Sequence, residues 1–165
     1  MTIEEMKEIV GRNLSNASVT HWNGPAATVL RVLINFVHDA GIVEFEKPIT
    51  RLQPIDIRFR NWEQSMMPAA LVDGMRFVAV ERTRCMEVFR RTFIDILYYG
   101  CPETREKVGT ALLFMAADLG ILSRSEPMFS RLASVLYKGG FGANRYEIEK
   151  TMDWATSHPD QPKPE

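Results

Sequence analysis

The 165-residue chain has the length of one ordinary domain, and its 45% hydrophobic and 25% charged residues are typical of a globular protein. A chain of this length buries enough surface on folding to need neither a metal nor a disulfide for stability. Its formal net charge of −1 excludes a protein held to nucleic acid or acidic lipid by bulk charge alone.

The first predicted element is a helix that begins at Ile3. Thr2 and Glu5 form a Thr-x-x-Glu capping box, and apolar residues then recur at helical spacing as far as Leu14. The stretch 13–20 is rich in Asn, Ser and Thr, a composition typical of a loop. We therefore expect this helix to end where that stretch begins.

A second helix is predicted from Gly24-Pro25 to Gly41. Proline in the first turn loses no hydrogen bond, and glycine is the usual residue just after a helix end. Almost every residue in between is apolar, which predicts a central helix with one narrow polar stripe. The stripe consists of Thr28, Arg31, Asn35, His38 and Asp39.

After the second helix the hydrophobic period changes from 3.6 to 2, which indicates strands. Apolar and charged residues alternate over 43–46 and again over 55–60. We expect these two short strands to pair antiparallel, with the apolar face packed on helices. The pairing would set Glu44 and Glu46 opposite Arg58 and Arg60.

A third helical region is predicted to start at Pro68, to break at Asp73-Gly74 and to continue as a long helix from Met75 to Tyr99. Gly100 ends it. Its expected buried stripe is Val78, Cys85, Phe89, Phe93 and Ile96. The opposite face alternates in charge along Arg84, Glu87, Arg91 and Asp95.

Three further helices complete the predicted order. The first covers 103–119, with Val108, Leu112, Met115 and Leu119 inward and Gly120 after its end. The next covers about 125–138, and the last about 144–156, where Asn144 and Glu147 form a variant of the capping box.

These elements predict a mainly α fold. We expect a single helical domain of about six helices over 1–156, with a short two-stranded β-ribbon between the second and third helices. Residues 157–165 include three prolines and no large apolar residue, so a disordered C-terminal tail is expected there.

Two cysteines, Cys85 and Cys101, lie within or beside apolar helical sequence and in no metal-type spacing. We expect both to be buried, reduced thiols. Together with an acidic N-terminus that lacks an apolar signal region, they favour an intracellular, reducing compartment. No stretch reaches the ~18 apolar residues that cross a bilayer, so no membrane partner is expected.

The histidines give little support for catalysis. No His-x-x-x-His, His-Glu-x-x-His or Cys-x-x-Cys spacing occurs, so we expect neither a metal nor another cofactor. His38 stands beside Asp39, but sequence neighbours on a helix point about 100° apart and are not expected to hold each other. We expect no enzyme, because no catalytic motif is present; an active site built from scattered residues would need a deep pocket that holds polar groups such as His38, Asp39 or Asp118.

Arginines are concentrated in the central third of the chain. Between Arg51 and Arg91 there are eight arginines and no lysine, against five acids. Arginines interleaved with aromatic residues can grip phosphate while the rings stack on bases. Internal ion pairing is the competing explanation, because nearly every one of these arginines has an acid within reach. The candidate binding residues are Arg58, Phe59, Arg60, Trp62, Arg82, Arg84, Arg90 and Arg91.

Two functional hypotheses follow. The first is a non-enzymatic helical protein that assembles into a homo-oligomer or binds a protein partner. The second is a small RNA-binding nucleoprotein or coat-like subunit that uses the Arg/aromatic surface, which requires the arginines to converge in one groove. The two overlap if assembly itself forms that groove.

Overall fold

The computed structural model describes residues 1–19, 24–45, 72–97 and 101–122, together with residues 130, 132–134, 136, 146 and 150. The predicted strand over 55–60 and the predicted tail over 157–165 lie outside the described residues. At 130, 132–134 and 136, and at 146 and 150, the backbone is helical, which agrees with the two predicted C-terminal helices.

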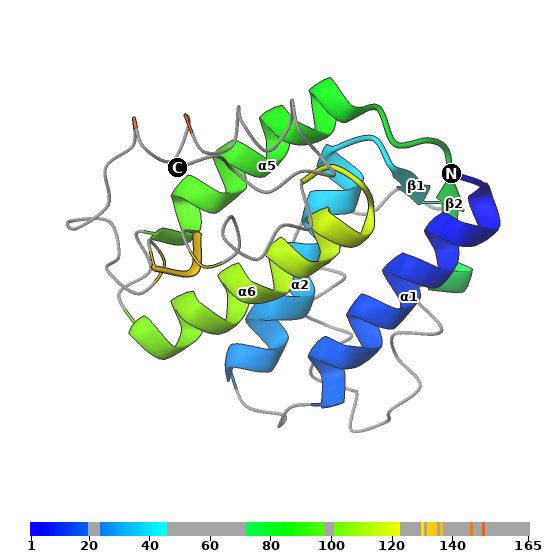
Figure 1. Ribbon diagram of the computed structural model, residues 1–165. Coiled ribbons are helices and arrows are strands. Elements are labelled where there is room, and N and C mark those ends of the chain that lie inside the picture. The colour runs from blue at the N-terminus through cyan, green and yellow to red at the C-terminus, as the bar shows by residue number, and fades with distance from the viewer. Residues whose placement is uncertain are drawn as a thin grey trace.

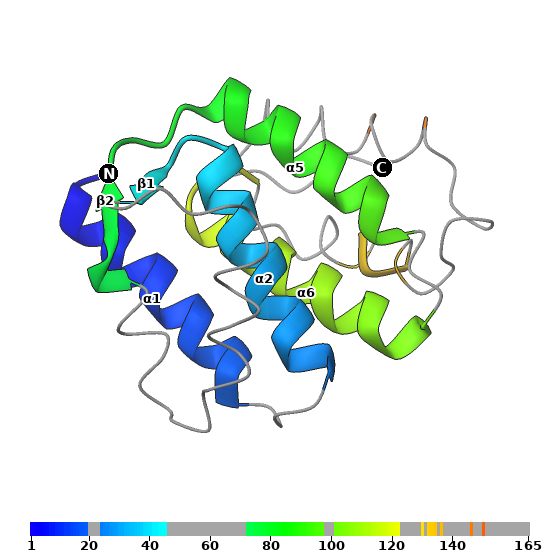
Figure 2. The same cartoon turned by 180° about the vertical axis from the view of Figure 1, so that it is seen from behind.

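The fold is mainly α with a small two-stranded antiparallel sheet, as predicted. The elements, in chain order, are α1 (Ile3–Val19), α2 (Gly24–Asp39), β1 (Val43–Phe45), β2 (Met75–Phe77), α5 (Arg82–Leu97) and α6 (Pro102–Asp118). α2 and α6 lie side by side in the middle, with α1 on one flank and α5 on the other (Figures 1 and 2). No helix in the described ranges is long and apolar enough to cross a membrane.

α2 is the central helix that its apolar sequence predicts, and it contacts α1, α5 and α6. Leu30, Leu33 and Ile34 are fully buried. Phe36 meets Phe89 of α5 edge-on, with ring centroids 6.4 Å apart, and Phe89 stacks on Phe93. The helix ends at Gly41 as expected, where a φ of 73° suits a residue without a Cβ.

The capping box of α1 forms as predicted, but the helix is longer than expected. The Thr2 N–H donates to Glu5 Oε2 at 2.7 Å, and the Glu5 N–H donates to Thr2 Oγ1 at 3.1 Å. The loop predicted over 13–20 is wrong at its start, because α1 continues to Val19. Leu14 is fully buried, and the Asn13 side chain is hydrogen-bonded, so tertiary packing outweighs the loop-like composition.

The sheet contains the predicted first strand, but in the described part of the chain that strand pairs with Met75–Phe77. The register sets Val43 opposite Phe77, Glu44 opposite Arg76 and Phe45 opposite Met75. Met75 and Phe77 are buried and Arg76 is exposed, so the segment has a period of two. A helix from Met75 onward was therefore a wrong prediction, since three residues are too few for the sequence to show that period.

The start of α5 is correspondingly later than predicted. Val78, expected in the core, is 43% exposed, and its N–H extends the sheet by donating to Ile42 O at 2.8 Å. The Glu81 carboxylate then accepts the N–H groups of Thr83 and Arg84 at 3.1 and 2.9 Å, so it caps the new helix. The rest of the stripe is as predicted, with Cys85, Phe89, Phe93 and Ile96 buried.

α6 packs as its pattern predicts. Val108, Leu112, Met115 and Leu119 are buried, and Gly120 has a φ of 76° after the helix end. Near its start, Gly109 lies against the side chain of Leu136, and Arg105 Nε donates to Leu136 O at 2.6 Å. Leu136 thereby contacts α6 through both its side chain and its carbonyl oxygen.

The two cysteines differ in environment. Cys85 is buried as expected, and burial raises the pKa of its thiol. Cys101 is exposed, which corrects the expectation of a buried thiol, because it precedes α6 at the N-cap instead of lying on a buried helix face. A hydrogen bond with the Thr104 side chain lowers the pKa of Cys101 below its ordinary value.

Candidate functional site

The eight residues proposed from the sequence as a binding surface are not one group in the described structure. Arg58, Phe59, Arg60 and Trp62 lie outside the described residues. The other four are on α5, where successive residues turn by about 100°. Arg84 and Arg91 are exposed, whereas Arg82 and Arg90 are half-buried and their Nε atoms are enclosed by protein. The α5 arginines thus fall on two sides of the helix.

Arg84 has a structural contact at the end of α2. Its Nη2 donates to Asp39 O at 3.4 Å, which places a positive charge at the negative end of the helix dipole. A Cβ at Gly41 would come within 2.7 Å of Arg84 Nη1, so the missing side chain makes room for the guanidinium. This contact supports the internal role that competed with a binding role for Arg84.

His38 and Asp39 meet at the same helix end, contrary to expectation. His38 Nδ1 lies 3.2 Å from Asp39 Oδ1. The angle of 100° separates the Cβ directions, but both side chains turn about χ1 and χ2, so their ends can converge. Asp118 is engaged elsewhere, by residues of α1. The three polar groups that an active site was expected to gather are therefore divided between two places.

A groove runs along the outer face of α1 and has a volume of about 590 Å³. Its α1 residues recur at three- and four-residue steps, and Met6, Val10 and Leu14 on the opposite face are buried in the core. The groove therefore follows the polar stripe of an amphipathic helix. It is lined by Glu4, Lys7, Glu8, Gly11, Arg12, Ser15, Val72 and Asp73.

The segment before β2 forms the other wall of the groove. Val72 is buried, and a Cβ on Gly11 would make an ordinary contact with Val72 Cγ2 at 3.8 Å, so the two walls are adjacent here. Lys7 Nζ lies 3.9 Å from Asp73 Oδ1, and this ion pair joins α1 to the opposite wall. The Lys7–Asp73 pair thus bridges the two walls of the groove.

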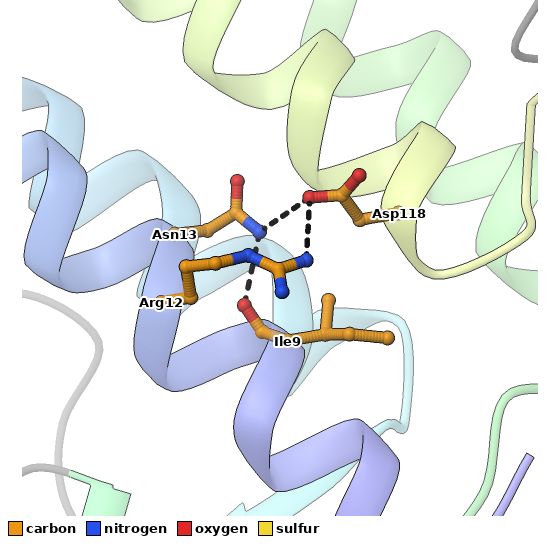
Figure 3. Close-up of polar contacts among 4 residues, drawn as sticks. All are labelled: Ile9, Arg12, Asn13 and Asp118. Carbon is orange, nitrogen blue, oxygen red and sulfur yellow. Dashed lines mark hydrogen bonds and ion pairs between the residues drawn. The ribbon is translucent and has the colours of Figure 1, made fainter.

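Arg12 is positioned by a polar junction between α1 and the end of α6 (Figure 3). Asp118 Oδ2 accepts from Arg12 Nη2 at 3.3 Å and from Asn13 Nδ2 at 3.1 Å. Asn13 Nδ2 also donates to Ile9 O at 2.9 Å, so both of its amide hydrogens have acceptors. Asn13 is only 8% exposed, and its two hydrogen bonds make that burial acceptable.

The charges of the groove are unequally balanced. Lys7 forms an ion pair with Asp73, and Arg12 forms one with Asp118. Glu4 and Glu8, one helical turn apart, are exposed and form no ion pair with any residue that the structure describes. The groove therefore presents two carboxylates that no cation among the described residues neutralises.

The groove was not among the sites predicted from the sequence. A signal was present, because Glu4, Lys7, Glu8, Gly11 and Arg12 share one face of the helix predicted from Ile3, although Ser15 falls in the stretch predicted as a loop. A polar face on an amphipathic helix is usually solvated, however, and only the approach of Val72 and Asp73 makes this one a groove.

Comparisons with protein-family models, with curated proteins and with solved structures return no match for this chain. Among the described residues, no three His, Cys, Asp or Glu side chains are grouped so that they could hold a metal ion. The evidence for the candidate site is therefore the arrangement of the residues that line the groove.

Proposed function

We propose that this chain is a non-enzymatic assembly protein that self-associates, and that the groove along α1 is a docking surface for the neighbouring subunit. The observation that carries the proposal is the groove itself, with two exposed carboxylates that form no ion pair with a described residue. Carboxylates on a binding surface favour partners that bring guanidinium or ammonium donors.

The shape of the groove supports a protein ligand. From Glu4 to Ser15 the lining spans eleven helical steps, or about 17 Å along the helix axis. An extended or helical segment of a partner can lie along such a surface, as in groove-binding modes of peptide recognition. Five of the eight lining residues are charged, as on the polar rim of a protein interface.

RNA binding remains the alternative, and the described residues give it little support. It requires several arginines to converge, yet Arg84 contacts the end of α2 and the α5 arginines divide between two sides. The alternative rests on Arg58 and Arg60, which lie outside the described residues. RNA binding is therefore one of the outcomes that the experiment below distinguishes.

The test is size-exclusion chromatography with light scattering over a range of concentrations, with absorbance read at 260 and 280 nm. We expect an oligomer without nucleic acid. A monomer at every concentration would overturn the proposal. An assembly with raised 260 nm absorbance, lost after nuclease treatment, would replace it with the RNA alternative.

A blocking variant then tests the groove. Ser15 is exposed at its end, so Ser15→Trp places a bulky side chain there without changing charge. Ser134→Trp is the matched control, because Ser134 is also exposed and helical but does not line the groove. We expect association to be lost only in Ser15→Trp. Equal association of both variants would exclude the groove as the docking surface.

A further inference from the structure

We infer that the groove is occupied by a second copy of this chain, whose Arg58 and Arg60 pair with Glu4 and Glu8. The inference rests on the proposed self-association and adds which charges make the contact. On this inference the Arg-rich segment binds carboxylates of a neighbouring protein chain and not phosphate groups.

Charge complementarity is the first argument. The cations of the groove are already engaged by Asp73 and Asp118, so they leave Glu4 and Glu8 to a cation from outside the described residues. Arg58 and Arg60 belong to a stretch of twelve residues, 51–62, that contains three arginines and one acid. Arginine is the side chain best suited to bidentate contact with a carboxylate.

Spacing is the second argument. Glu4 and Glu8 are four residues apart on one helix face, which separates them by about 6 Å along the axis. A strand over 55–60, which the alternating sequence predicts, would bring two side chains at i and i+2, those of Arg58 and Arg60, to one face about 6.6 Å apart. That expected spacing matches the spacing of Glu4 and Glu8.

The contact is between two different surfaces, the groove of one copy and the Arg-rich stretch of the next. Such a head-to-tail contact repeats, so it generates rings or open chains of subunits. We therefore expect the mass in light scattering to exceed that of a dimer as concentration rises.

Charge reversal tests the pairing. Glu4→Arg/Glu8→Arg loses the acidic surface, and Arg58→Glu/Arg60→Glu loses the basic one, so each variant alone should associate at least about tenfold more weakly than the wild-type chain. Mixed together, the two variants offer complementary surfaces again, and association should return. A control with the same charge change, Glu87→Arg/Asp95→Arg on the exposed face of α5, should associate like wild type.

Each result decides the inference. If Glu4→Arg/Glu8→Arg associates like wild type, the groove carboxylates make no contact and the inference fails. If each variant alone is impaired but mixing restores nothing, the two surfaces do not bind each other across copies, and pairing within one chain or with other partners replaces it. If either of these results is found while Ser15→Trp still abolishes association, the groove remains the docking surface. The proposed function then stands, and only the pairing with Arg58 and Arg60 is rejected. Circular dichroism checks that each variant is folded.

Discussion

Glu44 on β1 lies directly opposite Arg76 on β2, and the two side chains form an ion pair on the outward face of the sheet. The neighbouring residues Val43 on β1 and Met75 and Phe77 on β2 are buried. The sheet thus separates an apolar inner face from a charged outer one, and the ion pair aligns the register of the two strands.

The Glu44–Arg76 pair should contribute little to stability. Both side chains are more than half exposed, so water and salt screen the pair. A double-mutant cycle with Glu44→Ala and Arg76→Ala should give a coupling of about 0.2–1 kcal/mol in urea unfolding, smaller still at high salt. A coupling above about 2 kcal/mol, unaffected by salt, would contradict this view of the pair.

Alanine substitution at two helical glycines should change the stability of the fold in opposite directions. At Gly11 the added Cβ would make an ordinary contact with Val72 at 3.8 Å, so Gly11→Ala should stabilise by about 0.5–1 kcal/mol through helix propensity. At Gly109 the added Cβ would approach Leu136 Cδ2 to 2.2 Å, and Leu136 is fully buried. Gly109→Ala should therefore destabilise by about 1–3 kcal/mol. Equal shifts in thermal unfolding of the two variants would contradict the packing at Leu136.

The junction at Asp118 should stabilise the contact between α1 and α6. Asp118→Ala leaves the amide of Asn13 with one acceptor fewer in a buried place, and we expect a loss of about 1–2 kcal/mol in urea unfolding. Arg12→Ala should lose less than about 1 kcal/mol, since that side chain is half exposed. Glu106→Ala, an exposed position on α6, is the control. A loss at Arg12 larger than at Asp118 would show that Asn13 does not depend on this carboxylate.

The two thiols should react differently. Because the Thr104 hydrogen bond lowers the pKa of the exposed Cys101, its alkylation rate should reach half of its maximum at a lower pH in the native chain than in urea. The raised pKa and burial of Cys85 should keep that thiol unreactive until the chain unfolds. Thr104→Val should move the Cys101 midpoint upward. Mass spectrometry after timed iodoacetamide treatment measures both sites, and equal labelling of both in the native chain would refute the assignment.

The start of α1 and the ends of α2 and α6 were the most predictable features, because their determinants are local. Thr2 and Glu5 satisfy each other's backbone N–H groups within one turn, and Gly41 and Gly120 stop α2 and α6 by adopting a positive φ. Neither feature depends on distant parts of the chain. The same holds for the stripe of α5 from Cys85 to Ile96, whose spacing alone identifies the buried face.

The candidate site was less predictable. The polar face of α1 could be identified from its spacing, but the sequence does not show that Val72 and Asp73 stand beside it. The same limit applies to Arg84, which could be recognised as exposed on α5, whereas its contact with Asp39 O required the position of a second helix.

The sequence by itself determined that the fold is mainly helical, where α2 and α6 end and which residues of α6 and of α5 from Cys85 onward are inward. Those properties depend on side chains within one or two turns of each other. Only the tertiary structure decided the partner of β1, the length of α1 and the groove. An alternating strand can pair with any other alternating strand, and closing a loop of thirty residues instead of ten costs only about 1 kcal/mol more. Packing of Met75 and Phe77 against the core therefore selects the pairing, and it acts between residues far apart in the chain.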